Sequence, residues 1–396
     1  MNKEKLIAEI SDDQIRYILC QYNADSEYKV LSKRTSVNTG IIKGKILDFD
    51  YTAKKINEDV KNIEKESNKI FKKISIIVNE PEILCTNFTG IKKLNGSKVE
   101  KRDLEYILSE AKSSVTKNQK KNSILHILNS NFILDKSRQN KIPLNLRGNQ
   151  LGLHITFISF PKINLKNINE LFSNNDMKIE RVVSKPFVCG IDLLKKKKKL
   201  DDFFVINFDK ETSSISVYED RSLVFLRTFS FGTNSIYRDI EQLCSLKEKE
   251  VRRIIEEVNF NNITKEKIIF LEKKFFSETL FKRLSLNHIK DIIEARVNEM
   301  VNFVFNKNKN LHYLNGKISE QYLFFEDEKI FKNIHNFFEK TLIKGKISSK
   351  IESLILDDFS ALSGAAELIF KGWDKEAIPL INRKKSIISS FFERFF

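Results

Sequence analysis

The sequence predicts a mixed α/β protein with at least two domains, and three observations lead to this class. Stretches with the alternation or apolar runs of β-strands are interleaved with stretches that have the helical period of about 3.6 residues. The middle of the chain is strongly helical and charged. With 396 residues, the chain is also long enough to bury more than one hydrophobic core.

The first half of the chain alternates strands with helices. Its first two strands are separated only by the short polar turn SDDQ, and a proline bounds a later buried strand. The predicted strands are Leu6–Ile10, Ile15–Tyr22, Ile74–Val78, Ile124–Asp135 and Leu151–Phe160. The predicted helices are Tyr51–Lys69, Asp103–Ser113 and Leu165–Ser173.

The second half begins with a lysine run, Lys195–Lys199, which we interpret as a solvated linker because it lies between two apolar segments. A three-stranded meander follows, and Ile236–Phe305 is predicted to be mostly helical. The meander strands are 203–209, 213–219 and 223–231; a further strand is predicted at 320–327, and a small-residue helix at 357–373.

Cysteine and histidine give no sign of a metal centre. The four cysteines are scattered singly and the five histidines form no HExxH motif, so we expect reduced thiols in a cytoplasm and no bound metal. Met1–Lys5 leads straight into strand-like sequence and no run of about 18 apolar residues exists, so neither a signal peptide nor a transmembrane span is predicted.

The net charge of +16 raises nucleic acid and acidic membranes as partners. The basic residues are mostly lysines spread along the whole chain, without a zinc finger or a dense arginine cluster. This distribution favours weak attraction to any anionic surface, and we expect no nucleic-acid partner. DNA binding that is sensitive to salt and persists without the C-terminal segment would support the opposite view.

The last fourteen residues, RKKSIISSFFERFF, have the pattern of an amphipathic helix. At about 100° per residue, apolar side chains fill one half of the circumference and polar ones the other. Such a helix, with its aromatic face and flanking cations, is typical of the membrane interface. A terminal helix docked on the protein's own core is the alternative. The predicted membrane-binding residues are Lys384, Lys385, Ile387, Ile388, Phe391, Phe392, Arg394, Phe395 and Phe396.

Five blocks, in this order, resemble the FtsA family of bacterial division proteins in the actin-like superfamily. They are Asn122–Ser159, Val205–Ile240, the stretch IKDIIEARVNEMVNFV, the stretch FSALSGAAELIFKGW and the amphipathic C-terminal segment. The resemblance implies an actin-like (RNase H-like) two-domain α/β fold with an inserted strand–helix–strand–strand subdomain, called 1C. The implied segments are 1–82 (subdomain 1A, first part), 83–160 (1C), 161–199 (1A return and linker), 200–235 (2A, first part), 236–305 (2B), 306–347 (2A, second part), 348–375 (final 1A helix region) and 376–396 (linker and membrane helix).

Three loops that grip ATP in this family are altered in this sequence. The first, D/E-x-G-T-x-K in the family, reads Glu9 to Gln14 here, with Ser11 for the glycine. The second, D-I-G-G-G-T, reads Asn207 to Thr212 and has lost all three glycines. The third, T-G-G-A-x, aligns more loosely with Phe324 to Glu328. The degenerate positions are Ser11, Asp12, Asp13, Gln14, Asn207, Asp209, Lys210, Glu211, Thr212, Phe325 and Glu326.

These replacements predict that nucleotide binding is lost or weakened. Side chains at glycine positions remove the φ > 0 conformations and fill the space that phosphate would occupy, and carboxylates there repel phosphate. Only 12 of the residues are glycine, so other phosphate-cradling loops are scarce. We therefore expect ordinary polar turns, a pseudo-ATPase and no cofactor. ATP with Mg²⁺ remains an alternative if the cleft is remodelled, with Asp12, Asp209 and Glu211 as candidate Mg²⁺ ligands.

The resemblance implies a role in binding rather than catalysis, and no catalytic residue is predicted. It implies an adaptor on the cytoplasmic face of the bacterial inner membrane, at the division site, that tethers filaments of the tubulin-like protein FtsZ. The implied partners are the FtsZ C-terminal peptide, anionic lipid, later division proteins through 1C, and further copies of the chain in actin-like filaments. Arg296, Asn298 and Glu299 fall where the family receives the FtsZ peptide, although a simple exposed Arg296–Glu299 pair explains them equally well.

Two alternatives stay open within the same fold. One is an actin-like filament protein that still uses ATP; the other is an actin-like protein of pilus assembly. The missing glycines weigh against the first, and the amphipathic C-terminal segment favours division over the second.

Overall fold

The chain folds as two compact units. The computed structural model describes residues 3–12, 14–22, 28–139, 141–264, 268–309, 311, 320–344 and 350–377. Unit 1 comprises residues 1–201, 216–228 and 359–396, and unit 2 comprises 202–215 and 229–358. This division distinguishes two units only, so it does not test the finer subdomain boundaries inferred from the sequence, which remain predictions.

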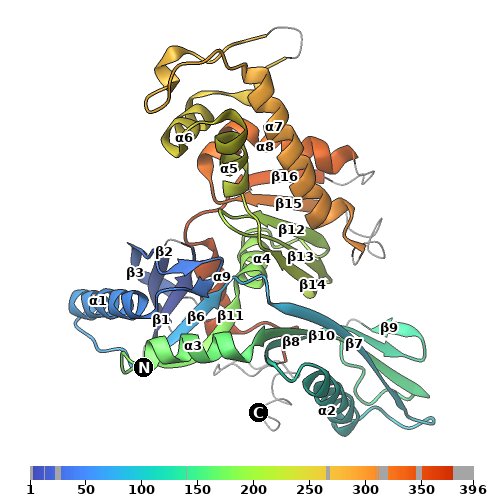
Figure 1. Cartoon of the computed structure of the whole chain (residues 1–396). Helices are drawn as coiled ribbons and strands as arrows, with labels where there is room; N and C mark the ends of the chain where they lie inside the picture. Colours follow the sequence, from blue (N-terminus) through green and yellow to red (C-terminus); the bar gives the residue numbers. More distant parts are fainter. Residues whose placement is uncertain are drawn as a thin grey trace. The chain divides into compact units, whose positions relative to one another are not determined.

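A five-stranded sheet with the order β11-β6-β1-β2-β3 forms the centre of unit 1 (Figure 1). Its strands β1, β6 and β11 are parallel, whereas β2 and β3 continue from β1 as an antiparallel meander. Apolar runs such as ISIIV account for its buried centre. The bounds are β1 Lys3–Ile10, β2 Gln14–Tyr22, β3 Tyr28–Val37, β6 Lys73–Val78 and β11 Lys178–Ser184. The three strands predicted here are confirmed.

Helices cover this sheet, and a short hairpin lies beside it. In α1, the buried residues Ile56, Val60 and Ile63 recur at helical spacing, and Asp48 caps the first turn by accepting the Tyr51 amide at 3.0 Å. Helix α9 packs on α4 and contacts β1, β2, β3 and β6. The bounds are α1 Phe49–Ser67, α3 Lys162–Ser173, α4 Lys185–Lys196 and α9 Ser360–Lys371, with the hairpin strands β4 Ile41–Ile42 and β5 Lys45–Ile46.

An inserted subdomain lies between β6 and α3 and has its own four-stranded sheet, with the order β7-β10-β8-β9. Helix α2 packs against β7 and β10, and its residues Ile107 and Val115 join a core that includes Ile127 and Phe157 (Figure 1). The predicted strand–helix–strand–strand order is confirmed, with β9 as a short addition. The bounds are β7 Leu84–Lys93, α2 Lys101–Asn118, β8 Asn122–Leu134, β9 Ser137–Gln139 and β10 Gln150–Pro161.

Unit 2 is built on the parallel strands β12, β15 and β16, which pair in that order. Its core is aromatic: the rings of Phe208, Phe325 and Phe338 lie 4.5–5.4 Å apart. The bounds are β12 Phe203–Phe208, α5 Asn234–Cys244, α6 Glu248–Glu257, α7 Leu286–Val301 with a π-helical continuation Asn302–Asn306, β15 Glu320–Phe325, α8 Glu328–Lys344 and β16 Lys350–Ile355. Two further strands, β13 Ser213–Glu219 and β14 Ser222–Phe229, lie where the chain passes between units.

Two sequence expectations are wrong in part. Lys195 and Lys196 are the last residues of α4 rather than linker, since the apolar surface before them is buried in a helix. Between α6 and α7, the predicted helical region holds only the 3₁₀ turns Phe260–Asn262 and Lys273–Phe275 in its described part. Within the described ranges, no helix is both long and apolar enough to cross a bilayer.

Candidate functional site

The first altered loop is a tight polar turn after β1. The Ser11 amide donates to the Gln14 carbonyl at 3.1 Å, which closes the connection to β2. The Asp12 carboxylate accepts the Gly44 amide of the β4–β5 hairpin at 3.1 Å. Asp13 lies outside the described residues. The backbone and side chains of this loop therefore bond to their own unit.

A buried cluster of charges lies beneath this turn, and the sequence analysis missed it. The Glu9 carboxylate accepts the Ser11 hydroxyl at 2.9 Å and lies 3.2 Å from the Lys185 ammonium and 3.7 Å from the Arg16 guanidinium. All three charged residues are at most 3% exposed. Arg16 and Lys185, two cations that could bind an anionic ligand, thus lie next to the Glu9 carboxylate instead. A glutamate within the apolar strand LIAEI and a lysine at the start of α4 were the only sequence signals.

The turn of the β4–β5 hairpin lies next to the first loop, since its Gly44 amide donates to Asp12. Gly44 has φ +74°, and an added Cβ would lie 2.6 Å from the Asn79 carbonyl oxygen, so this position requires glycine. The neighbouring Glu80 is buried and accepts a hydrogen bond from Asn164. Burial raises the pKa of Glu80 to about 7, because it outweighs the hydrogen bond from Asn164. The carboxyl ends of β1 and β6 therefore carry acidic side chains at this turn.

The second altered loop, in unit 2, is held by the start of α5. The Asp209 amide donates to the Thr212 carbonyl at 3.0 Å, and the loop carbonyls of Asp209 and Lys210 accept the amides of Thr233 and Asn234 at 2.9 Å each. An added Cβ at Gly232 would lie 2.3 Å from the Asp209 oxygen. The amino-terminal amides of a helix are natural phosphate ligands; here two of them bond to the loop.

Side-chain contacts also hold the second loop against α5, and a further hydrogen bond joins the second loop to the third. Arg238 of α5 forms a forked ion pair with Glu211, with distances of 2.9 and 3.2 Å. The Lys210 amide donates to the Glu326 carboxylate at 3.2 Å, and the Glu326 amide donates to the Phe208 carbonyl at the same distance. The structure thus joins two of the three predicted loops within unit 2. It places the first loop in unit 1.

Arg296, predicted for FtsZ contact, has a partner that the sequence did not reveal. Its guanidinium donates from Nε and Nη2 to both oxygens of Asp239 in α5, at 2.5 and 2.8 Å, and from Nη1 to Glu299 at 2.5 Å. The Asp239 hydrogen bond raises the pKa of Arg296. Asn298 accepts the Thr341 hydroxyl of α8 at 2.7 Å. Asp239 was out of reach of sequence reasoning because it lies 57 residues away.

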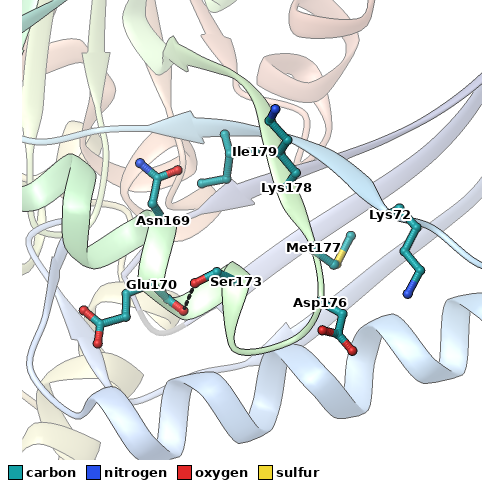
Figure 2. Close-up of a pocket in the computed structure, with 8 residues that line it drawn as sticks. All are labelled: Lys72, Asn169, Glu170, Ser173, Asp176, Met177, Lys178 and Ile179. Carbon is teal, nitrogen blue, oxygen red and sulfur yellow. Dashed lines mark hydrogen bonds between the residues drawn. The ribbon is translucent and has the colours of Figure 1, made fainter.

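The predicted membrane-binding segment lies outside the described residues, which end at Ala377. A shallow pocket of about 540 Å³ lies elsewhere in unit 1, at the amino ends of β6 and β11. Figure 2 shows its lining side chains, with the Ser173 hydroxyl bonded to the Glu170 carbonyl at 3.1 Å. Because β1, β6 and β11 are parallel, this pocket lies at the opposite end of the sheet from the first loop.

Comparison with solved structures defines the fold class. A chain of the "PilM-PilN type IV pilus biogenesis complex" covers 92% of this chain and 98% of its own, with a TM-score of 0.62 and 10% identity. The ethanolamine utilization protein EutJ from Carboxydothermus hydrogenoformans covers 92% and 89%, with a TM-score of 0.50 and 8% identity. The protein therefore has the actin-like two-domain α/β fold, with an inserted subdomain.

Comparison by sequence places the chain within this class. Residues 81–159 match the family described as "SHS2 domain inserted in FTSA". The cell division protein FtsA of Buchnera aphidicola subsp. Schizaphis graminum is 21% identical over 76% of this chain and 71% of its own length. FtsA of Borreliella burgdorferi is 20% identical over 62% and 60%. The inserted subdomain thus matches the domain found in FtsA, the chain is similar to FtsA proteins at about 20% identity, and these relatives support a role in cell division.

Proposed function

We propose that this protein is a nucleotide-independent membrane adaptor of cell division. It tethers FtsZ filaments to the cytoplasmic face of the inner membrane and helps to assemble the division machinery. The relationship to FtsA supports the division role. The amphipathic pattern of residues 383–396 supports the peripheral membrane attachment.

The observation that carries the nucleotide-independent part is that each altered loop bonds to its own unit. Phosphate binding needs free backbone amides and close approach of the chain. Here the amides of Thr233 and Asn234 donate to the second loop, and Glu211 is paired with Arg238. Buried Glu9 engages Lys185, the cation that could neutralise phosphate near the first loop. These residues do not fit a bound nucleotide, and the fold then serves as a scaffold.

Binding of a fluorescent ATP analogue with Mg²⁺ tests this part directly. We expect no saturable signal at protein concentrations up to about 100 μM, which corresponds to a binding free energy weaker than about −5.5 kcal/mol. A thermal-shift scan with unlabelled ATP should show no stabilisation. The control is competition, since a signal that excess ATP does not displace is nonspecific.

Micromolar binding that ATP displaces would overturn this part of the proposal. It would favour the second candidate, an actin-like filament protein switched by ATP. In that case, Lys185→Met should abolish the signal, because it removes one of the two buried cations beside Glu9 at the first loop.

A further inference from the structure

The last described segment, Trp373–Ala377, crosses the surface of unit 1, and we call it the C-terminal strap. Gly372, with φ +78°, ends α9 and turns the chain into the strap. The Asn129 amide donates to the Lys375 carbonyl at 2.8 Å, and the Ala377 amide donates to the Ile127 carbonyl at 2.7 Å. The strap is thus an antiparallel addition to the edge of β8, beside residues that β9 leaves uncovered.

A buried side-chain clasp fixes the register of the strap. Glu376 is 1% exposed, and its Oε1 lies 2.7 Å from His126 Nδ1 on β8. Arg181 on β11 donates to the same oxygen. The Ser184 amide donates to His126 Nε2 at 3.2 Å, so His126 is neutral and carries its proton on Nδ1. A shift of the strap by one residue would remove the carboxylate from this site, leaving Arg181 without its partner.

Two further contacts hold the outer side of the strap. Lys375 pairs with Asp220 at 2.8 Å, and the Trp373 indole donates to the Arg221 carbonyl at 3.2 Å. Asp220 and Arg221 form the tight β13–β14 turn, where both have positive φ. At the other end, the side chain of Ala377 is buried in the core of the inserted subdomain.

We propose that the C-terminal strap is a docking segment that fixes the root of the C-terminal tail on the β8 edge of the inserted subdomain. Three residues of backbone pairing are too few to hold a strand by themselves, whereas the clasp adds a buried, charge-assisted anchor. Movement of the tail is then transmitted to the inserted subdomain. Only the role of the tail as a membrane anchor rests on the proposed function.

Hydrogen exchange of the full chain without lipid tests the docking. In Glu376→Gln, the amides of Asn129 and Ala377 should exchange at least about tenfold faster than in the unaltered protein. Amides in the centre of β10, such as Phe157, should keep their rates. The matched control is Glu110→Gln on the exposed face of α2, for which we expect no change.

Unchanged exchange at Asn129 and Ala377 would overturn the proposal. An equal increase in exchange at Phe157 would also overturn it, because it would show unfolding of the subdomain rather than release of the strap. If Glu376→Gln fails to fold, Lys375→Glu serves instead. It places a carboxylate beside partly exposed Asp220 and should speed exchange at Asn129 and Ala377 but not at Phe157. The exchange experiment contains no lipid, so a failure of liposome binding would not affect the test of strap docking. Equally, a failure of strap docking would not decide whether the tail binds liposomes.

Discussion

Glu250 in α6 shows how one carboxylate fixes an irregular region of unit 2. It is fully buried and accepts the amides of Lys247, Glu278 and Thr279 at 2.8–2.9 Å, together with the Thr279 hydroxyl at 3.0 Å. Burial alone would raise its pKa, but these hydrogen bonds outweigh burial and lower the pKa of Glu250 to about 2. The stabilisation is therefore complete above the ordinary pKa of 4.5 and is lost as the pH falls towards 2.

We predict that Glu250→Gln lowers the unfolding free energy by about 2 kcal/mol near neutral pH, because several donors lose a charged acceptor. Urea unfolding followed by circular dichroism, between about pH 3 and pH 7, measures the difference from the unaltered chain. That difference should shrink at acid pH. A difference that is constant across the range would contradict the assignment. Glu257→Gln, which alters an exposed pair with Arg253, is the control.

Arg296 allows recognition of a partner to be separated from stability. If Arg296 meets the acidic FtsZ tail peptide, as the resemblance to FtsA implies, Arg296→Glu should weaken peptide binding at least about tenfold, because it replaces a cation with an anion. The single variant also leaves Asp239 and Glu299 facing a third carboxylate. Combining Arg296→Glu with Asp239→Arg should restore thermal stability but not affinity. Unchanged peptide affinity in Arg296→Glu would reject Arg296 as a contact of the FtsZ peptide. Affinity that is restored in the double variant would reject it as well.

Among the secondary-structure elements, α4 and α9 are packed with backbone against backbone. A Cβ at Gly364 would lie 1.9 Å from the Val188 carbonyl oxygen, so any larger residue must push the helices apart. We predict that Gly364→Ala lowers the unfolding free energy by about 3 kcal/mol. Gly152→Ala on β10 is the matched control, since the nearest atom to its Cβ would be the Ile133 Cβ at 3.4 Å. Equal thermal shifts in the two variants would contradict this account.

Elements with a clear hydrophobic period could be predicted from the sequence, whereas others could not. The strand of Ile74–Val78 and the helix α1 follow their patterns closely. Helix α4 was missed because its residues from Lys185 to Leu194 are all buried, so no polar face reveals the helical period. The strap was missed for another reason: its partners Leu128 and Arg181 lie far away in the chain.

At the scale of the whole molecule, the altered loops could be located from the sequence, but their closure could not. The replaced glycines are visible in the chain itself. The pairing of Glu211 with Arg238, or of Lys210 with Glu326, depends on folding that brings distant segments together. Local sequence therefore identified the replaced glycines, and only the structure identified the contacts that the altered loops make.

Attachment to membranes is a property of the whole molecule that the tail is predicted to confer. Full burial of a phenylalanine or isoleucine contributes about 1.5–3 kcal/mol, and each nearby cation adds about 1 kcal/mol at an anionic surface. We predict that Phe391→Asp with Phe395→Asp releases the protein from anionic liposomes in co-sedimentation. The control is Ser386→Asp with Ser390→Asp, which adds the same charge on the polar face. This variant should bind liposomes more strongly than the phenylalanine variant. Undiminished co-sedimentation of the phenylalanine variant would reject this face as the anchor.

The docked strap also sets a length limit on how far the protein can stand from the lipid. The positions 378–383 separate buried Ala377 from Lys384, where the predicted membrane-binding residues begin. The seven residue steps from Ala377 to Lys384 span at most about 25 Å when the chain is fully extended. With the strap docked, the β8 edge must therefore stay within about that distance of the headgroups. If the tail binds the membrane as we propose, the docked strap keeps the inserted subdomain close to the bilayer surface.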